Sequence, residues 1–142
     1  MCLLGEMKKD HTYYEKAWEE SDGKCSRAAR ALGKYYFYVP DFPKSIEWFE
    51  KGLNINRLYP DTWFTLGCAY MKNEDFKGAS FAFGSCISID NKIWDAWGNL
   101  ANCYLAQKKF FQAVSCCEQA LAINKKNWRL LNNYIQFSIE TL

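Results

Sequence analysis

The sequence predicts an all-α protein, a solenoid in which pairs of antiparallel helices follow one another along the chain. Three observations carry this prediction. The same residue types recur at a fixed distance, the apolar residues within each recurrence are spaced for one helix face, and turn-forming residues stand between the expected helices. Recurrence at a distance of this size is typical of a chain built from stacked copies of one small helical unit.

The recurrence is clearest in the middle of the chain. A step of 34 residues joins Trp63 with Trp97, Leu66 with Leu100, Gly67 with Ala101, Tyr70 with Tyr104, Phe76 with Phe110, and Ala79 with Ala113. The same step toward the amino terminus meets Leu32, Gly33, Tyr36, Phe42, Phe49 and Ile55. So many coincidences at one distance are not expected by chance.

The spacing within one recurrence predicts two helices. Trp63, Leu66 and Tyr70 stand at i, i+3 and i+7, which puts them on one face of a helix over residues 61–72. A second helix is expected over residues 76–89, after a turn-forming segment. Small residues inside these helices let the pair approach closely, at Gly67, Ala79 and Cys86.

The order Trp-x2-Leu-Gly-x2-Tyr, followed by Ala-x3-Phe, resembles the tetratricopeptide repeat (TPR) pattern. The resemblance implies a right-handed superhelix of repeats, each with a helix A and a helix B, in which the A helices line the concave face. The expected segments are residues 1–25 as the end of an irregular upstream repeat, residues 26–59, 60–93 and 94–127 as three repeats, and residues 128–142 as the A helix of a further or capping repeat. Within residues 1–23 we expect the end of one helix followed by a shortened B helix.

A narrower resemblance concerns particular stretches of the chain. Residues 14–19, 26–33, 63–70 and 96–100 are similar to the repeat region of the tetratricopeptide repeat protein 27 family. That resemblance implies a large intracellular adaptor with suggested links to chaperone-assisted assembly. It names no partner.

Composition and charge exclude several classes of protein. A net charge of +2 is too small to favour nucleic acid or an anionic membrane as a partner. Apolar runs are too short to span a bilayer, and no secretory signal is visible at the amino terminus. We therefore expect a cytoplasmic or nuclear protein with reduced thiols.

Cysteines, histidine and tryptophans are expected to have structural roles. Seven cysteines without a Cys-x-x-Cys spacing, and His11 as the single histidine, predict neither a metal site nor a cofactor. Cys116 and Cys117 are adjacent, so a vicinal redox pair is the alternative to helical packing for them. The six tryptophans are expected to pack in the core or between helices, at Trp18, Trp48, Trp63, Trp94, Trp97 and Trp128.

The shared register predicts which side chains line the concave groove. Residues of the A helices that point away from the B helices form it. The candidate partner-binding residues are Arg27, Arg30, Lys34, Phe64, Thr65, Lys72, Asn99, Asn102, Arg129, Asn133 and Gln136, with Asp61, Cys68, Asp95, Ala106 and Asn132 on the same face. This groove is basic at one end and rich in amides at the other.

The amides are the most informative local feature. Asn99 and Asn133 stand one repeat apart, and Asn102 lies one turn from Asn99. Carboxamides both donate and accept hydrogen bonds, so a row of them can pair with the main chain of an extended peptide. The alternative is that these are ordinary solvated side chains on an exposed helix face.

One specialised use of TPR grooves is not expected here. The clamp that grips the terminal carboxylate of a heat-shock chaperone needs Lys and Asn in one A helix, Asn in the next, and Lys and Arg in the third. Those positions hold Arg30, Lys34, Thr65, Asp95 and Asn99, or, one repeat later, Phe64, Cys68, Asn99, Arg129 and Asn133. Neither set completes the clamp, and Asp95 would repel a carboxylate.

The function predicted from these observations is a protein–protein interaction scaffold, or adaptor. It would bind an extended peptide or a helix in the concave groove, with no catalytic activity of its own. Phosphate loops, zinc-protease motifs and nucleophile elbows are absent from the sequence. Two alternatives remain, the targeting or substrate-recognition arm of a larger enzyme, and a helical repeat that binds RNA.

Overall fold

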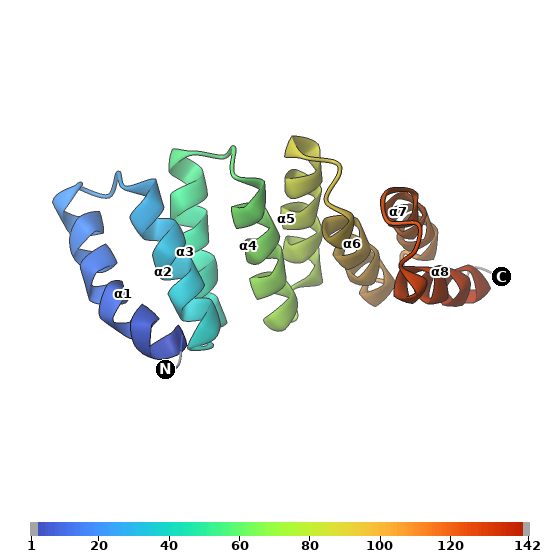
Figure 1. The fold of residues 1–142 in the computed structure, drawn as a ribbon, viewed down its shortest axis with the longest axis horizontal. Helices are drawn as coiled ribbons and strands as arrows, with labels where there is room; N and C mark the ends of the chain where they lie inside the picture. Colours follow the sequence, from blue (N-terminus) through green and yellow to red (C-terminus); the bar gives the residue numbers. More distant parts are fainter. Residues whose placement is uncertain (1–2, 141–142) are drawn as a thin grey trace.

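The computed structural model describes the fold of residues 3–140 and the side chains of residues 10–139. The helices of the described part are α1 Leu3–Glu20, α2 Ser26–Tyr38, α3 Phe42–Ile55, α4 Pro60–Lys72, α5 Phe76–Ile89, α6 Trp94–Ala106, α7 Phe110–Ile123 and α8 Trp128–Glu140. They stand in chain order along an elongated molecule, with the two termini at opposite ends (Figure 1). Their axes change direction along the row, from nearly upright at α3 and α5 to nearly horizontal at α8, so the row is a twisted solenoid (Figure 1).

Each helix packs mainly on the helix before it and the helix after it. The most extensive contacts join α2 with α3, α4 with α5, and α6 with α7, while the contacts between successive pairs are smaller. The two helices expected over residues 61–72 and 76–89 correspond to α4 and α5. The predicted all-α solenoid of helix pairs is therefore confirmed.

The helix starts follow from local sequence. A carboxylate oxygen of Asp41 accepts a hydrogen bond from the backbone N–H of Lys44 at 3.3 Å, and Asp75 accepts one from Gly78 at 3.0 Å. These bonds satisfy amide groups that the first turn of a helix leaves without partners. Pro60 is the first residue of α4, where its missing N–H is harmless.

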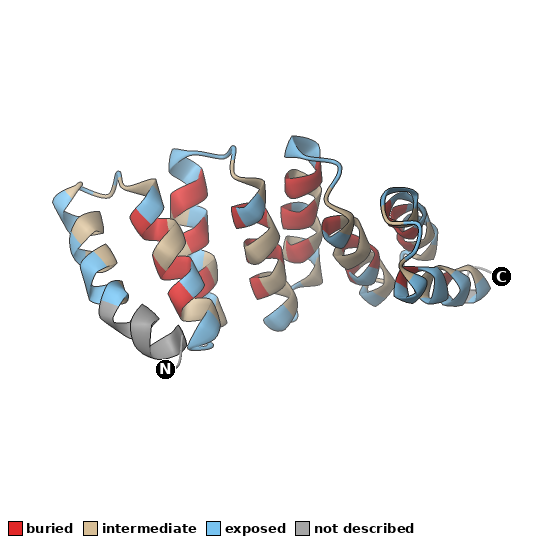
Figure 2. Cartoon of the chain, in the orientation of Figure 1, coloured by how far each residue is buried: buried red, intermediate tan, exposed pale blue. Residues whose placement is uncertain are grey.

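The core lies between the helices of each pair (Figure 2). Phe49 of α3 and Phe83 of α5 are fully buried, and each ring packs against a glycine of the preceding helix. A Cβ atom on Gly33 would lie 2.6 Å from the Phe49 ring, and one on Gly67 would lie 2.7 Å from the Phe83 ring. Glycine is therefore required at both positions for the helices to come this close.

The third pair, α6 and α7, packs with different residues at these two positions. Ala101 of α6 and Cys117 of α7 occupy the positions of the glycine and the phenylalanine, and both are buried. A larger residue on the A helix is thus matched by a smaller one on the B helix. One repeat length after Ala101 stands Ile135 of α8, which is half exposed.

Two expectations about the ends of the chain are wrong. Residues 1–23 were expected to hold two pieces of helix, but α1 runs without a break from Leu3 to Glu20. The segment from Glu6 to Glu20 contains neither glycine nor proline and is rich in Lys and Glu, so nothing in it ends a helix. Trp128 was expected to pack, but its side chain, at the first position of α8, is 77 % exposed.

Candidate functional site

The predicted groove residues of the carboxy-terminal end line one cavity between α6 and α8. Its volume is about 400 Å³. The lining residues are Trp94, Asp95, Gly98, Asn99 and Asn102 of α6, Asn127 of the α7–α8 loop, and Trp128, Arg129, Leu130 and Asn133 of α8. We call this the amide cavity. It brings together four of the predicted residues, Asn99, Asn102, Arg129 and Asn133.

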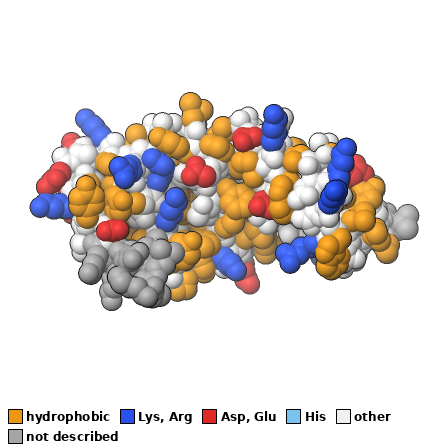
Figure 3. Space-filling view, viewed as in Figure 1, with side chains coloured by type: hydrophobic (Ala, Val, Ile, Leu, Met, Phe, Trp, Pro, Cys, Tyr) orange, Lys and Arg blue, Asp and Glu red, His pale blue; other side chains and the backbone are white. Residues whose placement is uncertain are grey.

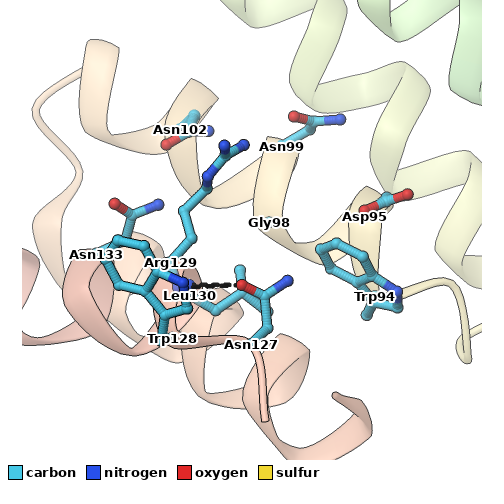
Figure 4. Close-up of a pocket in the computed structure, with 10 residues that line it drawn as sticks. All are labelled: Trp94, Asp95, Gly98, Asn99, Asn102, Asn127, Trp128, Arg129, Leu130 and Asn133. Atoms are coloured by element: carbon cyan, nitrogen blue, oxygen red, sulfur yellow. Dashed lines mark hydrogen bonds between the residues drawn. The ribbon is translucent and has the colours of Figure 1, made fainter. Parts of the chain in front are cut away.

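Polar side chains project into the amide cavity from both helices (Figure 4). Asn99 and Asn102 come from α6, while Asn133 and Arg129 come from α8, and the guanidinium of Arg129 extends toward Asn102. A carboxamide offers two N–H donors and an accepting oxygen, and a guanidinium offers donors only. The cavity can therefore hold a group with alternating donors and acceptors, such as a peptide main chain.

Two local features fix the shape of this cavity. A Cβ atom on Gly98 would lie 3.3 Å from a methyl group of Leu130, so glycine allows α8 to approach α6 closely. The side-chain oxygen of Asn127 accepts hydrogen bonds from the backbone N–H groups of Arg129 at 3.1 Å and Leu130 at 3.2 Å. These bonds begin α8 and set the positions of Arg129 and Asn133.

The cavity also contains residues that sequence reasoning did not assign to a site. Trp94 and Trp128 line it, although tryptophans were expected only to pack. They stand one repeat apart, at the first position of their helices, where α2 and α4 begin with Ser26 and Pro60. A tryptophan at the first position of α6 and α8, where the earlier A helices have Ser26 and Pro60, is the sequence signal that could have identified these two residues.

Asp95 adds a negative charge to the amide cavity. Burial raises the pKa of this carboxyl above its usual value, because desolvation disfavours the charged form. The side chain is nevertheless exposed enough to meet a ligand. Arg129 and Asp95 thus give the cavity one cation and one anion.

The predicted groove residues of the amino-terminal end line a second cavity, between α1 and α2. Its volume is about 320 Å³. The lining residues are Asp10, His11 and Tyr14 of α1, and Arg27, Arg30, Ala31, Lys34 and Tyr35 of α2. We call this the basic cavity. The α1 residues were missed because this segment was expected to hold the end of one helix and a shortened B helix, and groove candidates were taken from A helices only.

Aromatic contacts give the basic cavity firm walls. The rings of His11 and Tyr35 stack in parallel, with centroids 4.4 Å apart and an interplanar angle of 3°. The guanidinium carbon of Arg30 lies 3.8 Å from the centre of the Tyr59 ring. Lys and Arg side chains gather over α2 on the face seen in Figure 3.

The remaining predicted groove residues line neither of these two cavities. Phe64 packs its ring edge against Phe83, with centroids 5.5 Å apart, and the Thr65 hydroxyl donates to the carbonyl oxygen of Asp61 at 2.9 Å. Lys72 and Gln136 are exposed. Seven of the eleven candidate partner-binding residues therefore line one of the two cavities, and α4 stands between these two clusters.

The described residues also include His, Cys, Asp and Glu side chains, the usual protein ligands of metal ions. Among them, no three His, Cys, Asp or Glu side chains are close enough to hold a metal ion. Burial raises the pKa of the Cys103 thiol to about 12 and that of Cys116 to about 11, which keeps both protonated near neutral pH. No helix between residues 3 and 140 is long and apolar enough to cross a membrane.

Two family models, each described as tetratricopeptide repeat, match residues 60–93 and residues 94–127 of this chain. The chain is a tetratricopeptide repeat domain. The two matched segments contain α4 to α7 and the whole α6 side of the amide cavity.

Parts of this chain are similar in sequence to segments of longer curated proteins. A segment of 73 residues is 44% identical to the Tetratricopeptide repeat protein 27 homolog of Dictyostelium discoideum. This match covers 51% of this chain and 9% of that protein. The chain is also 37% identical over 97 residues to the Essential for maintenance of the cell wall protein 1 of Saccharomyces cerevisiae, covering 62% of this chain and 10% of that protein. The chain thus spans about a tenth of the length of these relatives.

Solved TPR structures share the fold. YrrB, described as a TPR protein with an unusual peptide-binding site, superposes with a TM-score of 0.89 at 17% identity, over 97% of this chain and 71% of that chain. The first TPR domain of Spaghetti (RPAP3), bound to the HSP90 peptide SRMEEVD, gives a TM-score of 0.73 at 18% identity, over 80% of this chain and 90% of that chain. At these identities the likeness concerns the fold alone.

Proposed function

We propose that this TPR domain is a protein-interaction scaffold that binds an extended segment of a partner protein across its A helices. One observation carries the proposal, the convergence of Asn99, Asn102 and Asn133 from two A helices on a single cavity of about 400 Å³. Solved TPR domains described as bound to an HSP90 peptide and as a complex with pHsp70 support the same function. The chain acts through this surface and has no catalytic activity of its own.

An extended segment suits the amide cavity better than a helix does. The main-chain groups of a helix are already hydrogen-bonded to one another, so they offer carboxamides nothing to pair with. An extended chain has free N–H and C=O groups at each residue. Carboxamides that stand on two neighbouring helices can pair with several of them, which holds the segment without demanding particular side chains.

Selection from a random peptide library displayed on phage tests the proposal. We expect the chain to enrich peptides whose binding falls about tenfold or more in the Asn99→Ala/Asn102→Ala/Asn133→Ala variant, as loss of several hydrogen bonds implies. A Gln112→Ala/Gln119→Ala variant is the matched control, since both amides are exposed on α7, away from the cavity. Both variants must keep the wild-type helicity and melting temperature. Peptides that bind the Asn variant and the wild type equally would contradict the proposal.

We also propose that the groove does not hold a chaperone tail as a carboxylate clamp. The clamp positions contain Asp95, whose carboxylate repels another, and Thr65, whose hydroxyl already donates to Asp61. Calorimetry with the peptide SRMEEVD, once with a free carboxy terminus and once amidated, tests this. We expect equal affinity for the two forms, and a clear preference for the free carboxylate would contradict us.

A further inference from the structure

We propose that the basic cavity binds Asp and Glu side chains of the partner, so that the segment held by this TPR domain contains an acidic stretch. The inference rests on the proposed function and names the chemistry of its ligand. It concerns a different surface from the amide cavity, because the basic cavity lies between α1 and α2.

The first step of the argument is charge. Arg27, Arg30 and Lys34 all line the basic cavity, whereas Asp10 is the only carboxylate among residues 10–139 that lines it. Among residues 10–139 the ion pairs join Lys16 with Glu20 and Lys51 with Glu47, so none of the three cations takes part in one. Three cations beside one carboxylate leave a surplus of positive charge that an acidic partner complements.

The second step is preorganisation. The guanidinium of Arg30 is stacked on Tyr59 at 3.8 Å, which fixes its plane before any ligand arrives. Its Nε atom is buried and has no hydrogen-bond partner among the described residues. A fixed guanidinium loses little side-chain entropy on binding a carboxylate.

The third step is the environment. The stacked rings of His11 and Tyr35, together with Tyr14, form aromatic walls beside the cations. Water is displaced from one side of a ligand in such a cavity, and charges attract more strongly there than on an open surface. The same cations on an exposed helix surface would contribute much less to the free energy of binding a carboxylate.

The spacing of the cations favours several carboxylates over one phosphate. Residues 27, 30 and 34 extend over seven helix positions, a rise of about 10 Å. Side chains on one side of an extended chain recur about every 7 Å, so two or three acidic residues can each reach a cation. A single phosphate group is too compact to meet all three.

Three short peptides with acetylated and amidated ends test this inference by fluorescence anisotropy with the 142-residue chain. One has Glu at alternate positions, the second has Gln in their place, and the third has a single phosphoserine. We expect the Glu peptide to bind about tenfold more tightly than the Gln peptide. Raising the salt concentration to about 0.3 M should remove most of that difference.

Substitutions locate the effect. Arg27→Gln/Lys34→Gln should lower affinity for the Glu peptide to that for the Gln peptide, and both residues are exposed, so the fold should be kept. The matched control is Lys77→Gln/Lys125→Gln, which removes the same charge from exposed positions that line neither cavity. It should leave the affinity within about twofold of wild type, because distant exposed charges are screened.

The outcomes separate the inference from the proposed function. Equal binding of the Glu and Gln peptides, or unchanged binding to the Arg27→Gln/Lys34→Gln variant, overturns the inference, and tighter binding of the phosphoserine peptide overturns the choice of carboxylates. If library peptides need Asn99, Asn102 and Asn133 but show no acidic preference, the proposed function stands and the inference fails. If the Glu preference holds while the Asn variant binds every peptide normally, the basic cavity stands and the amide cavity fails.

Discussion

Gly33 and Gly67 each face the ring of a phenylalanine on the following helix. The rings of Phe49 and Phe83 are fully buried, so they have no room to retreat from an added methyl group. In the third helix pair both residues are exchanged together, for Ala101 and Cys117. At the residue scale, the packing of a pair thus depends on the summed volume of two facing side chains.

Gly67→Ala should therefore destabilise the domain by about 1–3 kcal/mol through overpacking, although alanine favours helix. Gly84→Ala is the matched control, because nothing lies within 4 Å of the Cβ position at Gly84. It should stabilise α5 by up to about 1 kcal/mol. Urea unfolding followed by circular dichroism measures both changes. A stabilising Gly67→Ala would contradict the packing described for Phe83.

Buried thiols predict a loss of stability at alkaline pH. Burial raises the pKa values of Cys86, Cys116 and Cys117 to about 11, above the ordinary thiol value near 9. The unfolded chain then loses these protons first, so the thiols contribute fully below pH about 9, and that contribution is lost as the pH rises to about 11. The melting temperature should fall over this interval, and less steeply in a Cys116→Ala/Cys117→Ala variant.

Labelling separates this account of the cysteines from a redox role. Cys116 and Cys117 are buried, and the thiol of Cys117 donates to the Leu130 carbonyl oxygen at 3.2 Å. At pH 8 iodoacetamide should modify Cys25, which is only partly buried, well before it modifies this pair. Rapid labelling of Cys116 in the folded protein would favour the vicinal redox pair instead.

At the scale of the helix, the B helices differ in how they begin. Asp41 and Asp75 precede α3 and α5 and cap them with a side-chain oxygen, whereas Lys109 stands at the same place before α7 and provides no such bond. The backbone angles at the three positions are similar, with φ of -98°, -93° and -95°. The cap before α7 is therefore absent because of the side chain at Lys109, and not because the turn has a different backbone conformation.

Lys109→Asp should stabilise the domain by about 1 kcal/mol, by adding the cap and a favourable charge at the helix start. The substitution removes a cation near the Tyr104 ring, at 5.9 Å, which is a small loss at an exposed site. Thermal unfolding measures the change, with Lys109→Ala as the control that removes the same cation without adding a cap. A lower melting temperature for Lys109→Asp than for wild type would contradict the assignment.

Helices were easier to predict from the sequence than the surroundings of their side chains. The 34-residue recurrence and the helical spacing of Trp63, Leu66 and Tyr70 were enough to predict α4 and α5 almost to the residue. The continuity of α1 was missed because it departs from that recurrence, and only its lack of helix breakers carried the signal. The exposure of Trp128 depends on how α8 packs against α6, which local sequence does not contain.

The sequence predicted which face of the A helices carries the candidate residues. It did not predict that these residues line two separate cavities. Register alone selected the A-helix residues, and four of them meet in the amide cavity. Their division into two clusters depends on tertiary packing, as when Arg30 stacks on Tyr59 from a neighbouring helix pair. The contribution of His11 and Tyr14 required knowing that α1 packs on α2. The roles of all these residues in binding stay predictions.

At the scale of the whole molecule, stability should vary along the row of helices. Helices α1 and α8 each pack mainly on one neighbour, whereas α4 and α5 each pack on two. In such a solenoid the stability of a unit depends on its own contacts and on its nearest neighbours.

Native-state hydrogen exchange should therefore show a gradient. We expect amides of α8 and α1 to exchange through local openings that cost little free energy, and those of α4 and α5 only through openings several kcal/mol more costly. Mass spectrometry of peptides from each helix measures the rates. Uniform protection along the chain would mean that the domain unfolds as a single cooperative unit instead.

Ile135 limits which side chains another helix could place against the exposed face of α8 that carries it. In the pairs α2–α3 and α4–α5 the A helix supplies the hollow and the B helix supplies the bulk. At Ile135 the bulk is already on α8, together with the exposed side chains of Leu131 and Ile139. If the packing helix had a phenylalanine at the position that Phe49 and Phe83 occupy in α3 and α5, the ring would clash with Ile135. A glycine or an alanine at that position would fit. The large residue therefore stands on the A helix at this end of the solenoid, and the small residue would have to stand on its partner.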